Sequence, residues 1–353
     1  NTNSIDQMRV ITAGAKAEYG RNAGAQILLV TRSGGARWSG EAYHYLQNDA
    51  LNANDFFNNT VDGKKPKSDL NTFGFSLGGP AIGNRALIFG NYEGMRAKQE
   101  IVRNRTVLMS DAKAGIFSWL PLGSTTVETF DLVKNDPRGR GIDPAVAKIL
   151  RLLPAPNNGA VGDGLNTAGY RFNNPVNGAE DQFTIRVDYN LTADHRLFFR
   201  QSWARNNSVD WQDNADATFP GQPSGTEKDR PWGFSLGSDW IVSPRMVNEF
   251  RAGRQSDSIS LLRPARQSAP MMVSGLWTDP LNPDFPSSRS TAVNEVADNL
   301  TFIRGQHSFK AGLNLRFTTQ KSSTATGLFP DVTFGPSFGN EPPASIGPGI
   351  ASV

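Results

Sequence analysis

Residues 182–205, QFTIRVDYNLTADHRLFFRQSWAR, guide the interpretation of the whole chain. Apolar and polar side chains alternate on both sides of a short polar break, and the apolar set is Phe183, Ile185, Val187, Tyr189, Leu197, Phe199 and Trp203. A period of two places the two sets on opposite faces of a strand. Two such runs around a short break predict an antiparallel hairpin.

The register of this hairpin stays open. The apolar residues hold odd positions in both runs, so every pairing with an even position sum keeps them on one face. One such register pairs Asp188 with Arg196, and another places Arg186 opposite Arg200. The sequence alone does not select between them.

The alternation does not say what lies beyond each face. A soluble sheet buries its apolar face and exposes the other to water. An outer-membrane barrel turns apolar side chains toward lipid and polar ones toward a lumen. The runs are about 8 to 11 residues long, which roughly matches the 9 to 11 that a tilted strand needs to cross the hydrocarbon layer. Both interpretations are open at this point.

Composition narrows the classes of protein. The chain has 353 residues, a mean hydropathy of −0.42 and no stretch near 18 consecutive apolar residues, which excludes a helical membrane span. Its 35 Gly, 22 Pro and 21 Phe favour strands and turns. A net charge of +3 without a basic block argues against nucleic acid. The absence of cysteine excludes disulfides and thiol chemistry.

The lengths of the connections decide between the two interpretations. Long loops are expected near 48–70, 108–180, 206–229 and 262–293, and they alternate with short turns near 80–85, 191–194, 243–245 and 304–307. In an up-and-down meander every second connection lies at the same end. Long loops on one side and tight turns on the other are typical of outer-membrane barrels and unusual in sandwiches and propellers. The sequence therefore predicts an all-β, antiparallel up-and-down transmembrane β-barrel, with about nine strands present.

Aromatic residues near the expected strand ends suit the interfacial belts of such a barrel, although packing explains each one taken alone: Trp38, Tyr92, Tyr189, Trp203, Trp232 and Trp240. Outside the barrel strands, 8–11 and 26–31 are expected to be short strands. One helix is expected over 143–153, because Asp143 can cap it and Pro144 suits its first position.

Residues that could carry chemistry are few. The three histidines have no metal-binding or catalytic spacing, and a turn or rim position in solvent explains them: His44, His195 and His307. An acidic run could touch Ca²⁺, but its order does not match an EF-hand loop and a solvated loop explains it better: Asp210, Asp213, Asn214 and Asp216. We expect no enzyme, no cofactor and no catalytic, cofactor-binding or metal-binding residue. The substrate-binding residues are unknown.

Several stretches resemble TonB-dependent outer-membrane receptors of the Oar-like group, which carries a carboxypeptidase-regulatory-like domain ahead of the plug. They are AEYGRNAGAQILLVTRSGG (17–35), WSGEAYHYLQNDALNANDFFNN (38–59), FGFSLGGPAIGNRALIFGNYEG (73–94), DPAVAKILRLLPAPN (143–157) and GQHSFKAGLNLRF (305–317). By this resemblance, residues 1–35 would be the C-terminal end of the plug domain and residues 36–353 the N-terminal part of the barrel. The chain would then be a fragment that lacks the earlier domains and the later strands.

The resemblance also implies a function. Such a receptor lies in the bacterial outer membrane, binds an external substrate such as a saccharide, peptide or metal chelate, and imports it into the periplasm. Its partners would be outer-membrane lipid and, through the missing N-terminal part, the TonB complex of the inner membrane. From the alternation we expect polar residues to line the lumen and contact the plug: Arg186, Asp188, Arg200 and Arg316.

Two other classes remain as alternatives. One is a secreted or surface-exposed β-protein that acts as an adhesion or binding module. The other is a soluble propeller or sandwich enzyme, for which the sequence offers no cluster of acid, base or nucleophile.

Overall fold

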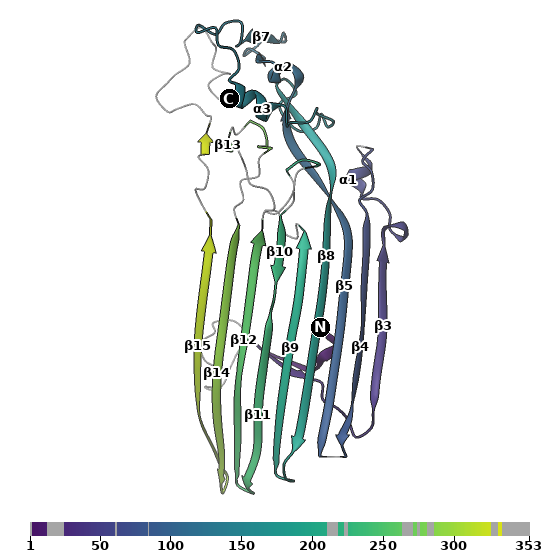
Figure 1. The fold of residues 1–353 in the computed structure, drawn as a ribbon, viewed down its shortest axis with the longest axis vertical. Coiled ribbons are helices and arrows are strands. Elements are labelled where there is room, and N and C mark those ends of the chain that lie inside the picture. Colours follow the sequence, from purple (N-terminus) through teal and green to yellow (C-terminus); the bar gives the residue numbers. More distant parts are fainter. Residues whose placement is uncertain are drawn as a thin grey trace.

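The structure is a computed structural model that describes residues 2–12, 25–60, 62–83, 85–209, 218–221, 225–262, 271–273, 276–280, 286–325 and 331–333. Most of the described chain forms one antiparallel sheet of ten strands (Figure 1). In chain order these are β3 (Ser39–Asn48), β4 (Ser68–Ile82), β5 (Ala86–Leu108), β8 (Thr167–Asn190), β9 (His195–Val209), β10 (Thr226–Asp229), β11 (Trp232–Ser243), β12 (Met246–Leu262), β14 (Ser287–Arg304) and β15 (His307–Thr324).

The strands follow one another across the sheet as an up-and-down meander. β10 and β11 share one position between β9 and β12, so the ten strands occupy nine places. The break between them falls at Arg230 and Pro231, because proline has no N–H to donate to the ladder. The predicted fold class, with about nine strands, is confirmed.

Smaller elements surround this sheet. Three two-stranded sheets are formed by β1 (Ile5–Ile11) with β2 (Gln26–Thr31), β6 (Ile116–Trp119) with β7 (Glu128–Asp131), and β13 (Met271–Val273) with β16 (Asp331–Thr333). The helices are short: η1 (Thr2–Ser4), η2 (Asp49–Leu51), α1 (Phe56–Asn59), α2 (Ser110–Lys113) and α3 (Pro144–Leu150). Asp143 caps α3 and Pro144 begins it, as predicted. No helix in the described part of the chain is long and apolar enough to cross a membrane.

Tight turns join the strands at the lower end of Figure 1, and the long connections lie at the upper end. The strands run further into those connections than expected. β8 begins at Thr167, inside the segment predicted as loop 108–180, and β14 begins at Ser287, inside the one predicted as 262–293. Residues 167–177 of β8 pair with β5, and on their other edge Gly169 forms a bridge with Asn158. Their Asn, Gly and Pro residues suggest a loop, but pairing mainly on a single edge tolerates them.

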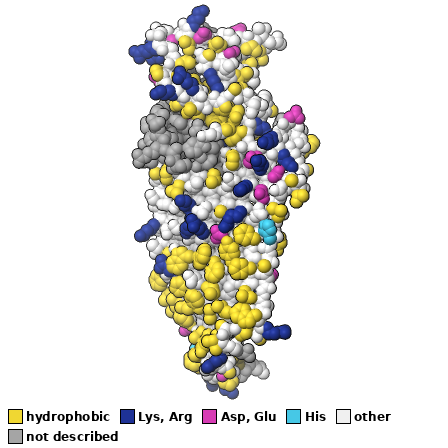
Figure 2. Space-filling view, turned by 45° about the vertical axis from the view of Figure 1, so that its right-hand side comes forward, with side chains coloured by type: hydrophobic (Ala, Val, Ile, Leu, Met, Phe, Trp, Pro, Cys, Tyr) yellow, Lys and Arg dark blue, Asp and Glu magenta, His cyan; other side chains and the backbone are white. Residues whose placement is uncertain are grey.

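The hairpin over residues 182–205 adopts the register that places Arg186 opposite Arg200. Each neighbouring strand continues the same parity, so apolar residues form a row across eight strands: Gly79, Ile88, Val187, Phe199, Leu236, Ala252, Val296 and Leu315. We call the face that carries this row the outer face. Its side chains are not buried together: Leu236 is 44% exposed and Leu315 also 44%. Figure 2 shows hydrophobic side chains gathered over the lower part of the molecule.

An aromatic row lies four residues further up the outer face, and its members pair strand by strand: Phe75, Tyr92, Phe183, Trp203 and Trp232. Phe183 and Trp203 have ring centroids 5.7 Å apart. Toward the tight turns, Trp240 stacks on His195 at 5.3 Å. Trp232 and Trp240 are eight residues apart, which is about 27 Å along a strand and comparable with the apolar band of about 25 Å in outer-membrane barrels.

The buried hydrophobic cluster of the described chain lies at the upper end of β5, where residues of the long connections pack against the strand. Val107, Leu108, Leu153 and Phe219 are its core, with Trp277 packed against it. Hydrogen bonds join the same end of β5 to two of these connections, since Thr278 N donates to Thr106 O at 2.8 Å and Arg105 Nε donates to Thr218 O at 3.2 Å. The connections therefore form one packed cap above the sheet.

Candidate lumen site

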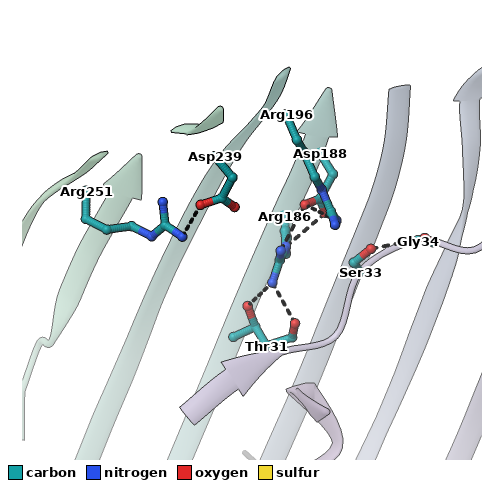
Figure 3. A network of polar contacts seen from close by, with 8 residues as sticks. All are labelled: Thr31, Ser33, Gly34, Arg186, Asp188, Arg196, Asp239 and Arg251. Carbon is teal, nitrogen blue, oxygen red and sulfur yellow. Dashed lines mark hydrogen bonds and ion pairs between the residues drawn. The ribbon is translucent and has the colours of Figure 1, made fainter. Parts of the chain in front are cut away.

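The face opposite the apolar row carries most of the charged side chains of the central strands. We call it the inner face. Its residues alternate with those of the outer face, and the charged ones on β8 to β15 include Arg186, Asp188, Arg196, Arg200, Asp239, Arg251, Glu295 and Arg316. Figure 3 shows the network formed by several of them.

Asp188 is the centre of this network, with only 2% of its side chain exposed. Arg186 binds it with two donors, Nε to Oδ2 and Nη2 to Oδ1, each at 2.9 Å. Arg196 adds a third, Nη2 to Oδ1 at 2.7 Å. A buried carboxylate is tolerated only when charge and hydrogen bonds compensate its lost hydration, and here two guanidinium groups do so.

Arg186 also reaches the N-terminal β1–β2 hairpin. Its Nη1 donates to the carbonyl oxygen of Thr31 at 2.7 Å and to Thr31 Oγ1 at 3.1 Å. Nearby, Arg32 forms an ion pair with Glu41 of β3 at 3.0 Å. The end of β2 and the residue after it are therefore held on the inner face by polar contacts to β8 and β3, of which Figure 3 shows the contact between Thr31 and Arg186.

Gly34, three residues after Thr31, allows the backbone to pass this close to the wall. Gly34 is buried against β4 and β5, and a Cβ added there would lie 2.4 Å from Ile88 O and 2.7 Å from Gly79 O. Both are backbone atoms, which cannot turn away as a side chain does. The close contact of this segment with the wall thus requires the absence of a side chain at residue 34.

A second cluster surrounds Phe198. The guanidinium carbons of Arg186 and Arg251 each lie 5.1 Å from its ring centroid. Arg251 forms an ion pair with Asp239 (Figure 3). An aromatic ring between two cations is attracted to both, so Phe198 links the β8 network to the β12 side of the wall.

A cavity of about 700 Å³ opens between the β1–β2 hairpin and the wall. Leu29 and Thr31 of β2 line one side. Arg200, Ser202 and Ser235 are among the residues that line the other. Its volume falls within the range of about 300–1,000 Å³ typical of small-molecule pockets.

The four predicted lumen residues differ in what they contact. Arg186 contacts Thr31 as expected of a residue that touches the N-terminal segment, and Asp188 holds Arg186 in place. Arg316 lies further along the wall, where it pairs with Glu295 at 3.0 Å. Arg200 lines the cavity. Phe198 is a lumen residue that the pattern of charged side chains does not mark, although its even position between Arg196 and Arg200 places it on the charged face.

The histidines take separate positions. His44 Nε2 lies 3.0 Å from Asn71 Oδ1, His195 Nε2 lies 2.8 Å from Ser238 Oγ, and His307 packs against Phe309. Within the described ranges, no three His, Asp or Glu side chains gather as a metal site would require. The acidic run at 210–216 lies outside the described residues.

One carboxylate in the cap has a strongly shifted pKa. Burial alone would raise the pKa of Asp163, but hydrogen bonds from the N–H groups of Thr167, Leu165 and Asn166 outweigh it and lower the pKa to about 2. Those three bonds measure 2.7, 2.9 and 2.8 Å. Lys113 ties the same cap together, because its Nζ donates to Leu153 O at 2.7 Å and Pro154 O at 2.9 Å.

An antiparallel meander with an apolar outer face, an aromatic row and a charged inner face is the architecture of an outer-membrane β-barrel. The sequence profile of the family "Outer membrane beta barrel domain" matches residues 30–352. The chain belongs to this family, and its location is the outer membrane.

The solved structures that match this chain include a transporter, a channel and a receptor. The outer membrane transporter YddB from Escherichia coli has 10% identity and a TM-score of 0.47 over 90% of this chain and 35% of that one. The CymD monoaromatic hydrocarbon channel has 9% identity and a TM-score of 0.23, covering 89% and 83% of the two chains. The siderophore receptor PiuA from Acinetobacter baumannii has 9% identity and a TM-score of 0.26, covering 91% and 52%.

The chain thus spans about a third of the length of YddB. No curated protein matches the sequence.

Proposed function

We propose that the chain is part of a TonB-dependent outer-membrane receptor that binds an external substrate and imports it into the periplasm. Residues 1–35 would be the C-terminal end of a plug domain, and residues 36–353 would be the N-terminal part of the barrel. The long connections would face the cell exterior. The substrate would be a saccharide, a peptide or a metal chelate.

The contact between Arg186 and Thr31 carries this proposal. A chain segment fixed to the inner face of the wall is what a plugged barrel requires, whereas an open pore or an adhesion module needs no such segment. The contact uses a charged donor, a backbone acceptor and a side-chain hydroxyl. Polar bonds of this kind allow a segment to be held at rest and released under force, because each contributes only about 1–3 kcal/mol.

The motifs of the sequence analysis support the same proposal. The stretches 17–35 and 38–59 resemble the junction between plug and barrel in Oar-like receptors, and Gly34, which passes close to the wall, lies at the end of the first. The Oar-like assignment accounts for both sides of that junction with one domain boundary near residue 35.

Growth on defined nutrients tests the proposal. Strains with and without the gene would be grown on panels of saccharides, peptides and ferric chelates as the limiting source of carbon, nitrogen or iron. We expect loss of the gene to impair growth on one panel, and inactivation of TonB to impair it equally. A growth defect that does not depend on TonB would point instead to a passive channel.

A further inference from the structure

Arg200 is in an unusual position for a cation. It lies directly opposite Arg186 in the β8–β9 register, and like charges in such pairs repel each other. The guanidinium group of Arg186 already has partners, because it forms an ion pair with Asp188 and donates a hydrogen bond to Thr31. The Nε of Arg200 is shielded from solvent and has no hydrogen-bond partner among the residues that the structure describes. A shielded, unpaired cationic donor is costly, so an anion would be stabilising there.

The cavity described above lies beside Arg200. Ser235 and then Gly253 follow it across β11 and β12 in the same register. One pair further along, Ser202 lies opposite Gly233. All four line the cavity together with Arg200. These small side chains leave room next to the guanidinium group, and two of them carry hydroxyl groups.

Three acidic side chains of the inner face already have cationic partners, and Glu180 is a further acidic residue that lines the cavity. Asp188 is paired with Arg186 and Arg196, Asp239 with Arg251, and Glu295 with Arg316. Each of these pairs is closed within the described wall. Arg200 takes part in none of these ion pairs, so its guanidinium group is available to an anion that enters the cavity.

We propose that Arg200, assisted by the hydroxyl groups of Ser202 and Ser235, binds the carboxylate or phosphate group of a small solute in this cavity. A guanidinium group offers parallel N–H donors that match both anions. The inference deepens the proposed function by giving the imported substrate an anionic group, and it rests on that function only for the route by which the solute arrives.

Binding to the purified full-length protein in detergent tests the site without any transport step. Citrate and inorganic phosphate would be titrated calorimetrically at constant ionic strength, with glucose as an uncharged control solute. We expect both anions to bind and glucose not to. Arg200→Gln should weaken citrate binding at least tenfold, and Arg200→Lys by less. Arg138→Gln should leave the affinity unchanged, because that exposed arginine lies between β7 and α3 and does not line the cavity.

Two results would overturn the inference. One is equal citrate affinity in the wild type and Arg200→Gln. The other is no anion binding by the wild type together with a lower unfolding temperature of Arg200→Gln, which would show that Arg200 is paired inside the protein. Anion binding that depends on Arg200 in a protein whose uptake does not need TonB would support the site while contradicting the proposed function.

Discussion

Arg186 and Thr31 are 155 positions apart in the chain, yet the guanidinium group of the first donates to both the carbonyl and the hydroxyl oxygen of the second. The same guanidinium group binds Asp188 with its other two donor positions. One side chain thus joins the barrel wall, a buried carboxylate and the N-terminal segment, so a change at this residue affects all three.

Arg186→Met should destabilise the folded protein by about 3 kcal/mol, because it leaves Asp188 buried with one cation in place of two. It should also loosen the 25–35 segment from the wall. Unfolding in urea would report the first effect, and the rate of proteolysis within residues 25–35 the second. Arg316→Gln is the matched control, since its ion pair with Glu295 lies at an exposed position. Unchanged proteolysis in Arg186→Met would show that the contact to Thr31 does not hold the segment.

Gly34→Ala should weaken the same attachment for a steric reason. The new Cβ would lie 2.4 Å from Ile88 O, so the segment must move away from β5. Overpacking of this kind costs about 1–3 kcal/mol. Gly35→Ala is the control, because its nearest atom would be Arg37 O at 3.6 Å. Proteolysis of the N-terminal segment should increase in Gly34→Ala alone. Equal susceptibility of the two variants would contradict the close approach.

Charge on the outer face should be far less tolerated than charge on the inner face. Val296 lies in the apolar row of the outer face, and the adjacent Ala297 lies on the inner face. An arginine exposed to lipid near the bilayer midplane costs about 2–4 kcal/mol. We expect Val296→Arg to lower the yield of protein folded into lipid vesicles, and Ala297→Arg to fold at nearly the wild-type yield. The reverse order would mean that the outer face is not the lipid face.

The cap should lose stability in acid. The pKa of Asp163 is lowered to about 2 in the folded protein, from an ordinary value of 3.8. Its carboxylate therefore stabilises the cap fully above pH 4, and this contribution disappears as the pH falls through 2. Hydrogen exchange of the amides of 163–167 at pH 5 and pH 2.5 would measure it.

Asp163→Asn should raise the exchange of those amides at pH 5 and make it less dependent on pH. Asp111→Asn, in the same cap at the start of α2, provides the comparison. Identical pH profiles for wild type and Asp163→Asn would exclude the carboxylate as the cause.

Much of the fold follows from the sequence because strand parity is a local property. The odd apolar positions of 183–189 and 197–203 predicted one face, and the alternation of long and short connections predicted the meander. The limits of the strands do not follow from local sequence in the same way. Residues 167–180 have the composition of a loop, and they form a strand because they pair with β5, which is far away in the sequence.

The lumen site was predictable only in part. Alternation placed Arg186, Asp188, Arg200 and Arg316 on one face, but the choice of partner depends on register. Both candidate registers keep the apolar face intact, and only the structure selects the one with Arg186 opposite Arg200. In this register Arg196 reaches Asp188 from a diagonal position on β9, and Arg200 lines the cavity.

The sequence by itself determined which side chains share a face, because the direction of a side chain in a strand follows from its position in the chain. Only the tertiary structure decided what those side chains touch. Three features depend on segments that are distant in sequence: the hydrogen bond between Arg186 and Thr31, the close approach of Gly34 to Ile88, and the cavity beside Arg200. No local pattern encodes such contacts, since they arise when the sheet brings separate strands and the N-terminal hairpin together.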